Sequence, residues 1–466
     1  MKDFRHKNGL VILTLACPIE CGHCIFSCTR SKDPRKWMPE KTIRRVAEEF
    51  HVNKINKILI TGGEPFYDLK KLFNSLRIFL NYFNPEMISI ATSGFWAIGK
   101  SSTYNVLNDI RKMGIKRIEV SWDRFHAKRV KLKNIENILT EAKKLQMEVC
   151  LRPIIDMESS AIKNKIKQLI LKYSPAVAFA ITEPIGRAAI FDKRLLGTNE
   201  NLNGFISEIE NYAKIWRGKN YPLVVTTFPN GNVYGCCNAF KLAYMGNINN
   251  QQLKPMIQKI KTTLPGYIFL NNLSCSFLDK FIPSTSSHKC DLCANQPFDN
   301  KISGEECHGR KFIEMSIKDL EKCEKYDNKY ELLLSFSLTI DDLKKENGKK
   351  IVNFLNSLKR EGVKVKLSRP LPKCMFQPNE ISELKEFNIV YNCFECNELF
   401  SIKNEMIQFC PNVYKIKGPK FEGMKDRKEL FEHFKRIHNE LELEEKCLNC
   451  IYLKRGQCNA ICFRKK

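Results

Sequence analysis

The chain has 466 residues, 77 of them lysine or arginine and 51 aspartate or glutamate, which gives a formal net charge of +26. This length allows about three domains, and core burial is no constraint at this size. No apolar run approaches the roughly 20 residues of a membrane-spanning helix, so the sequence predicts a soluble, cytoplasmic protein without a membrane partner.

Twenty cysteines are far more than ordinary usage. The N-terminus imitates a signal peptide, with a basic start followed by the apolar run GLVILTLAC. That run is short, however, and Leu15 stands where a cleavage site usually has a small residue. Cleavage would also remove the strand that presents the first cysteines. In a reducing compartment, metal ligation is favoured over disulfides.

The positive charge has two interpretations. It could form a surface for an acidic partner, such as RNA or an acidic peptide. The basic residues are scattered, for example over 111–117, 128–133 and 163–167, rather than gathered in one tract. A solvated lysine-rich face is therefore the favoured interpretation.

Strand-length apolar runs alternate with helical-period stretches up to about residue 185. The predicted strands are Leu10–Ala16, Lys57–Thr61, Met87–Thr92, Arg117–Ser121, Glu148–Arg152 and Ala176–Ile181. The predicted helices lie near Pro39–Phe50, Leu69–Tyr82, Ser102–Met113, Asn134–Leu145 and Ala161–Tyr173. This alternation predicts parallel βαβ units, and six of them match an α/β fold with a partial (β/α)6 barrel of the TIM type.

The pattern breaks after Gly186, and the remaining chain is divided by composition. We expect a core barrel over 1–225, a cysteine-rich module over 226–310 and a polar linker over 311–330. Residues 331–466 then carry a strand–helix–strand element and a second cysteine-rich module. The predicted fold is thus a barrel followed by cysteine-rich α+β modules.

Cys17, Cys21 and Cys24 follow the first predicted strand in the spacing C-x3-C-x2-C. Three thiolates can hold three irons of a 4Fe–4S cubane, which normally takes four cysteine ligands, so the fourth iron stays open. The loop lies at the carboxyl end of a strand, where active-site loops of β/α barrels are found.

One strand later, the chain reads Thr61-Gly62-Gly63-Glu64-Pro65. Two glycines let the backbone approach a ligand closely, because no Cβ is in the way. A glutamate beside exposed carbonyls suits an ammonium donor rather than a phosphate. A glycine pair alone is more often just a turn.

Together these two motifs resemble the radical SAM superfamily, over about residues 8–190. The resemblance implies that the open iron is chelated by S-adenosylmethionine (SAM). It also implies one-electron cleavage of SAM to a 5′-deoxyadenosyl radical that takes a hydrogen atom from the substrate. The electron donor would be a flavodoxin or a ferredoxin. The implied SAM contacts are His23, Gly62, Gly63, Glu64, Pro65, Ser93, Ser121, Asp123, Arg152, Gly186 and Arg187.

Several of these residues end successive predicted strands. Ser93 replaces the asparagine of the family's TNG-like turn, and Ser121-Trp122-Asp123 resembles its ribose-contacting S-x-D. Arg152 would pair with the SAM carboxylate, and residues 183–187 resemble a P-x-G-R segment. His23 departs from the aromatic residue usual before the third cysteine. Polar residues at strand ends are also ordinary turn formers.

The later cysteines resemble SPASM-type modules, which carry auxiliary 4Fe–4S clusters. At the C-terminus the implied ligands are Cys374, Cys393, Cys396, Cys410, Cys447, Cys450, Cys458 and Cys462. In the middle module they are Cys236 or Cys237 with Cys275, Cys290 and Cys293. The C-terminal cysteines depart from the SPASM pattern, so the implied number of auxiliary clusters is one or two. Structural zinc is the alternative for both modules, because paired CxxC sequences suit it equally well.

The resemblance favours an enzyme that modifies a peptide or protein, with a separate leader-binding protein as a possible partner. The alternatives are action on a small molecule or on RNA, and a non-enzymatic zinc-binding protein. The sequence does not identify the substrate.

Overall fold

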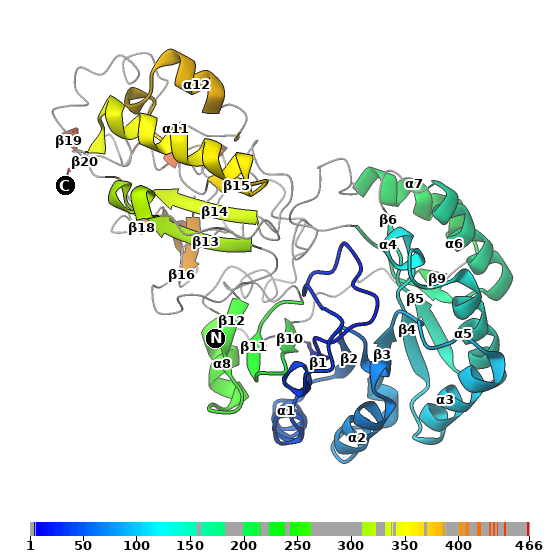
Figure 1. Cartoon of the computed structure of the whole chain (residues 1–466). Helices are drawn as coiled ribbons and strands as arrows, with labels where there is room; N and C mark the ends of the chain where they lie inside the picture. The colour runs from blue at the N-terminus through cyan, green and yellow to red at the C-terminus, as the bar shows by residue number, and fades with distance from the viewer. Residues whose placement is uncertain are drawn as a thin grey trace. The chain divides into compact units, whose positions relative to one another are not determined.

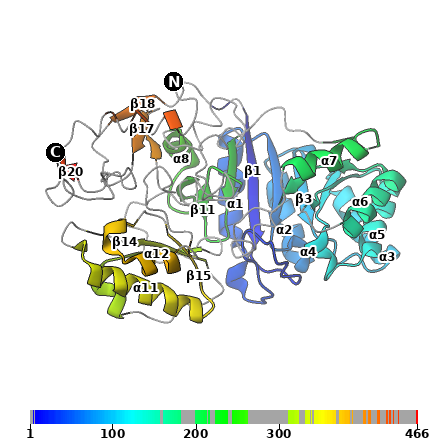
Figure 2. The same ribbon diagram turned by 90° about the horizontal axis from the view of Figure 1, so that it is seen from above.

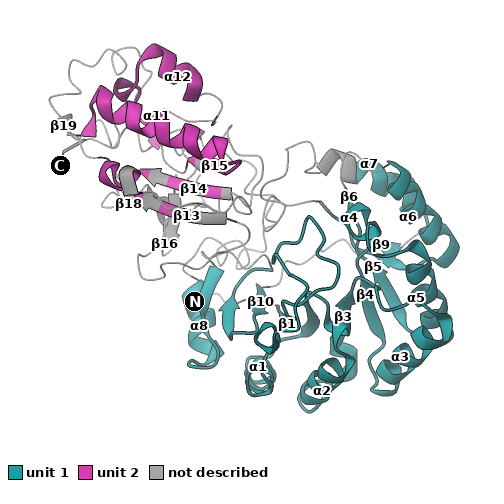
Figure 3. Ribbon diagram, in the orientation of Figure 1, with its two compact units in different colours: residues 1–261, 268–273 teal, residues 262–267, 274–466 magenta. Residues whose placement is uncertain are grey.

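The computed structural model describes most of residues 4–261 and parts of the rest. The described residues are 4, 6–155, 160–181, 199–212, 214–215, 223–237, 243–261, 310–322, 331–336, 338, 342–367, 371–384, 387, 400–403, 406–409, 417–420, 428–429, 432–433, 436, 442–443 and 464–465. The chain divides into two compact units (Figure 3). The first comprises residues 1–261 and 268–273, and the second residues 262–267 and 274–466.

The first unit is built around a ten-stranded sheet in the order β12-β11-β10-β1-β2-β3-β4-β5-β7-β9. Its strands are β1 (Lys7–Thr14), β2 (Lys57–Gly62), β3 (Ile88–Thr92), β4 (Arg117–Val120), β5 (Glu148–Leu151), β7 (Ala176–Val177), β9 (Lys214–Ile215), β10 (Leu223–Thr227), β11 (Asn232–Tyr234) and β12 (Tyr244–Asn247). Neighbours from β10 to β9 run parallel, whereas β11 and β12 join in antiparallel pairs. Within the described residues the two ends of this order do not pair, so the sheet is open.

Helices connect the strands of this unit (Figures 1 and 2). They are α1 (Glu40–Val52), α2 (Leu69–Leu80), α3 (Lys100–Lys112), α4 (Arg124–Ala127), α5 (Leu132–Lys144), α6 (Ser160–Tyr173), α7 (Asn199–Ile209) and α8 (Leu253–Ile260). Helix α2 shows why they form: Asp68 caps it by accepting a hydrogen bond from the Lys71 amide (3.1 Å). Its buried residues Leu72, Leu76 and Phe79 recur at helical spacing and form one apolar face.

The predicted alternation of strands and helices is present up to residue 181. Strand β1 begins three residues before its predicted start at Leu10. The last predicted strand, Ala176–Ile181, is divided into β7 and β8 (Ala180–Ile181), and β8 pairs with β6 (Ile154–Ile155). The prediction of an α/β fold built from parallel βαβ units is therefore confirmed, and the sheet that these units form is open.

The structure differs from the predicted boundary after residue 225, which falls inside β10. Strand β10 pairs in parallel with β1, with Leu223 opposite Lys7, and the β11–β12 hairpin and α8 follow it. Residues 223–261 therefore continue the first unit instead of starting a separate module. The physical reason is that β2 covers only one edge of β1, and the other edge hydrogen-bonds to this later strand.

The second unit contains a three-stranded parallel sheet, β13 (Arg310–Met315), β14 (Glu331–Phe336) and β15 (Lys364–Leu367). Helix α11 (Lys345–Arg360) connects β14 to β15, as predicted, and buries Ile351, Leu355 and Leu358 against the sheet's core. A 3-10 helix (Ile317–Lys322) follows β13, another spans Lys373–Met375, and α12 covers Pro378–Leu384.

The predicted linker over 311–330 contains most of β13. Its mixture of charged and apolar residues, RKFIEM, contains no long apolar run, and only the pairing with β14 makes it a strand. Further on, β16 (Phe400–Lys403), β17 (Met406–Phe409) and β18 (Lys417–Lys420) form an antiparallel sheet, and β19 (Glu442–Leu443) pairs with β20 (Arg464–Lys465). In the part of the chain that the structure describes, no helix is long and apolar enough to cross a membrane.

Candidate active site at the cysteine loop

Residues 17–28, here called the cysteine loop, leave the sheet at the carboxyl end of β1. The loop returns to its own start: the Cys17 amide donates to the Thr29 carbonyl (2.9 Å), and the Thr29 amide donates to the Leu15 carbonyl (3.2 Å). Near its end, the Cys28 amide donates to the Cys24 sulfur (3.4 Å). Cys17 is buried, and Cys21 and Cys24 are half-buried. The three predicted ligands therefore belong to one closed loop.

The electrostatics of these thiols fit a cationic group. Burial raises the pKa of the Cys17 thiol to about 11, and the charge of Glu64 adds to the rise. The pKa of Cys21 also rises, through its hydrogen bond with Cys24, then burial, then the charges of Cys24 and Cys17. Thiolates that repel one another in a buried loop need a cation to coexist, so the donor set suits an iron–sulfur cluster.

Gly62 and Gly63 hold the end of β2 against the chain that leads into the cysteine loop. The Gly63 amide donates to the Thr14 carbonyl (2.6 Å) and the Glu64 amide to the Ala16 carbonyl (3.0 Å). A Cβ at Gly62 would lie 2.3 Å from the Thr14 oxygen, and one at Gly63 would lie 2.3 Å from the Ala16 oxygen. The close approach predicted for a ligand is thus made to the protein's own backbone.

The Glu64 carboxylate is completely buried and accepts hydrogen bonds from the protein itself. One oxygen accepts from the Phe66 amide (3.1 Å) and the Thr92 hydroxyl (2.9 Å). The other accepts from the amide (2.8 Å) and the hydroxyl of Ser93. Burial raises the pKa of Glu64, and the bonds from Ser93 and Thr92 oppose that rise. Its predicted contact with the SAM amine stays a prediction.

Pro65 begins a short 3-10 helix, Pro65–Tyr67, for which Glu64 is the cap. On the adjoining turn, the Thr92 hydroxyl also accepts from the Trp96 indole (3.0 Å). Phe66 and Trp96 stack with ring centroids 4.6 Å apart and an interplanar angle of 6°. The GGEP segment and the Ser93 turn are therefore one packed assembly beside the cysteine loop.

Asp123 caps α4 and orients the histidine on it. Its Oδ1 accepts from the amides of Phe125 (2.9 Å) and His126 (3.2 Å), and its Oδ2 lies 2.9 Å from the His126 Nδ1. The Ile154 amide also donates to Oδ2 (3.4 Å). Although burial by itself raises the pKa of Asp123, the nearby His126 and His23 hold it below its ordinary value. The ribose contacts predicted for Ser121 and Asp123 stay predictions.

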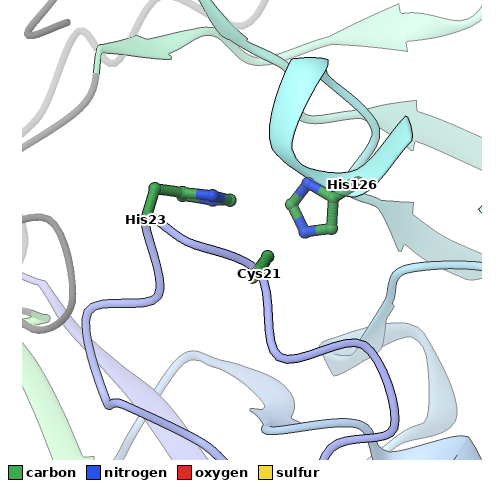
Figure 4. A group of neighbouring side chains, drawn as sticks. All are labelled: Cys21, His23 and His126. Atoms are coloured by element: carbon green, nitrogen blue, oxygen red, sulfur yellow. The ribbon is translucent and has the colours of Figure 1, made fainter. Parts of the chain in front are cut away.

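Figure 4 shows Cys21, His23 and His126 turned toward a common space. One ligand atom from each of the three lies within 4.8 Å of the other two. His23 packs on Phe125 with ring centroids 4.5 Å apart, and on His126 at 4.9 Å. Sequence reasoning missed His126. The available signal was Asp123 three residues earlier, since Asp is a preferred cap and Asp-x-x-His puts both side chains on one helical turn.

Arg152 lies at the end of β5, and its side chain is hydrogen-bonded to the carboxylate of Glu119. Its guanidinium donates to Glu119 on β4 (2.8 Å), and Glu119 also accepts from the Ser89 hydroxyl (3.3 Å). An ion pair of 3.5 Å joins Arg117 to the same carboxylate. The predicted role of Arg152 at the SAM carboxylate stays a prediction.

The other predicted ligands lie in several places. Cys236 and Cys237 follow β11 in the first unit, one buried and one exposed, and Cys374 is half-buried in the second unit. The remaining predicted residues lie outside the described part of the chain: Gly186, Arg187, Cys275, Cys290, Cys293, Cys393, Cys396, Cys410, Cys447, Cys450, Cys458 and Cys462.

Comparison with known proteins gives a relative and solved structures that each match more than half of this chain. The chain is 26% identical over 309 residues to YydG of Bacillus subtilis (strain 168), provisionally named a peptide biosynthesis protein, covering 62% of this chain and 92% of that protein. A solved structure of anSMEcpe with bound AdoMet is similar at 13% identity and a TM-score of 0.43, over 62% of this chain and 88% of that one. BtrN in complex with AdoMet and 2-DOIA is similar at 15% identity and a TM-score of 0.34, over 66% and 98%.

A family model described as the radical SAM superfamily matches residues 11–155. These residues run from β1 through β6 and include the cysteine loop, the GGEP segment and Asp123. The chain therefore contains a radical SAM domain, carried by residues 11–155.

Proposed function

We propose that the protein is a radical SAM enzyme whose 4Fe–4S cluster is held by Cys17, Cys21 and Cys24. The observation that carries this proposal is the junction of β1 and β2, where backbone bonds tie Gly63 and Glu64 to the start of a loop with three clustered thiols. When bound, the cluster and SAM supply one-electron cleavage of SAM and a 5′-deoxyadenosyl radical that takes hydrogen from the substrate. The chain's residues position both cofactors and exclude water.

The chemistry is tested on anaerobically reconstituted protein given dithionite and SAM. We expect release of 5′-deoxyadenosine, and none above background from a Cys17/Cys21/Cys24→Ala triple variant. Iron analysis checks the cause, because the variant should lose about four iron atoms per chain. As a control, Cys150→Ala, in β5 and outside every proposed ligand set, should retain the activity. Activity in the triple variant would overturn the assignment.

We further propose that the substrate is a peptide or protein. The similarity to YydG spans 92% of that protein, which is named for peptide biosynthesis. The net charge of +26 would suit an acidic leader peptide. We also propose one or two auxiliary clusters. Their proposed ligands are Cys374 and the C-terminal cysteines named in the sequence analysis.

A deuterated candidate peptide tests the substrate class. The candidate is the product of a short open reading frame beside this chain's gene, if one is present. With the correct peptide we expect deuterium in 5′-deoxyadenosine and a mass change in the peptide, both by mass spectrometry. The matched control is the same peptide with a scrambled sequence. Deuterium transfer from small molecules or RNA, with none from peptides, would contradict this proposal.

A further inference from the structure

Two histidines and one cysteine of the site form a set of possible metal ligands. A cluster held by Cys17, Cys21 and Cys24 would use the cysteine of this set but neither histidine. Cys21 and His23 belong to the cysteine loop, and His126 comes from α4, more than 100 residues later. Both imidazoles are buried, with His23 at 7% and His126 at 8% exposure. Their ligand atoms and the Cys21 sulfur all lie within 4.8 Å of one another (Figure 4).

The surroundings of His126 are those of a metal-ligating histidine. Its Nδ1 lies 2.9 Å from Oδ2 of Asp123, a carboxylate with no exposed surface. Metal-bound histidines commonly give their second ring nitrogen to a carboxylate, which fixes the tautomer and the ring orientation. With Nδ1 paired to Asp123, the Nε2 edge is the one available to a metal. In Figure 4 the ring lies edge-on to the space that it shares with Cys21 and His23.

We propose that, when no cluster is bound, Cys21, His23 and His126 bind a single divalent ion of the zinc or cobalt type. One thiolate and two imidazoles are a ligand set that zinc accepts, with a fourth position for water. Bond lengths of about 2.0–2.3 Å place tetrahedral ligand atoms about 3.3–3.6 Å apart, so the ligand atoms, now within 4.8 Å of one another, need to approach by up to about 1.5 Å.

This ion and the proposed cluster exclude each other because both need Cys21. That consequence rests on the proposed function, whereas binding of the ion does not. Zinc bound in this way would block cluster assembly through one shared ligand while leaving Cys17 and Cys24 unligated. That asymmetry between the three cysteines separates this site from zinc held by the three thiols.

The test is pulsed alkylation of the full-length, reduced, cluster-free protein with and without Zn²⁺, read by peptide mass spectrometry. Cys24 is the internal reference, because it lies in the same loop and is also half-buried. We expect zinc to slow alkylation of Cys21 at least tenfold more than that of Cys24. Equal protection of Cys17, Cys21 and Cys24 would overturn the proposal, since the zinc would then be bound by the three thiols.

Substitutions of His23 and His126 test whether each histidine is a ligand of the zinc ion. His126→Gln and His23→Gln should each abolish the zinc protection of Cys21, and Asp123→Asn should weaken zinc binding at least tenfold. His51→Gln, on the exposed side of α1, is the matched control and should keep full protection. Protection that survives in His126→Gln would overturn the proposal. Circular dichroism confirms that each variant is folded.

Cluster reconstitution separates this inference from the proposed function. His126→Gln retains all three cysteines, so it should still take up iron and absorb near 400 nm. Preloaded zinc should slow reconstitution of the wild-type protein but not of His126→Gln. If no variant and no wild-type protein builds a cluster while the zinc results are as expected, the metal site stands and the proposed function fails.

Discussion

Replacing Glu64 with glutamine should lower the free energy of unfolding of the first unit by about 3 kcal/mol. The carboxylate accepts four hydrogen bonds, from the Phe66 amide, the Thr92 hydroxyl and two groups of Ser93. An amide NH2 cannot accept, so whichever oxygen it replaces, one buried backbone amide, of Phe66 or of Ser93, would face another donor. The measurement is urea unfolding of cluster-free protein, followed by tryptophan fluorescence. All four tryptophans lie between residues 37 and 216, so the signal reports on this unit.

The same variant separates two roles for Glu64. If the carboxylate acted only as a ligand for the SAM amine, glutamine would weaken SAM binding and leave the unfolding curve unchanged. The structure predicts that stability falls even without SAM. Glu48→Gln is the control, because Glu48 is exposed on α1 and its pair with Arg45 spans 3.3 Å at the surface. Its effect should stay within about 0.5 kcal/mol.

Replacing Gly63 with alanine should reduce the iron taken up at the cysteine loop to a small fraction of the wild-type amount. The added Cβ would lie 2.3 Å from the Ala16 oxygen and 3.1 Å from the Cys17 Cβ. Real Cβ atoms do not approach backbone this closely, so β1 and β2 must move apart next to Cys17, where the cysteine loop begins. Iron per chain and absorbance near 400 nm, after anaerobic reconstitution, measure the loss.

A second glycine supplies the matched control. Gly204, on α7, has nothing within 4 Å of an added Cβ, so Gly204→Ala should load iron normally. Alanine there should stabilise the helix slightly, by about 0.5–1 kcal/mol. Normal iron loading in Gly63→Ala would show that the close approach of β2 to β1 is not required to place Cys17.

The strands that carry the site were predictable, because runs of strand length that are rich in apolar residues alternate there with helices that have an apolar face. The interval between Cys17 and Cys24 is local, so three thiols on one short loop follow from the covalent chain. The same local patterns also placed α11 between β14 and β15 in the second unit.

Pairings between distant segments were not predictable in this way. Strand β10 reads as an apolar run with no indication that its partner is β1, more than 200 residues earlier. Half of the residues in strand β13 are charged, and the segment becomes a strand only by pairing with β14. Sheet edges are chosen by the complete set of strands, and one segment's sequence does not contain that information.

The amino-acid sequence by itself determined the spacing of the three cysteines in the cysteine loop and the order of strands and helices around it, because spacing and periodicity are properties of neighbouring residues. Tertiary structure decided what the side chains of these motifs touch. It placed the glycines of GGEP against β1, gave the Glu64 carboxylate donors from Thr92 of β3 and from the following Ser93, and brought His126 beside Cys21. Each of these depends on contacts between residues far apart in the chain, which only packing of the sheet brings together.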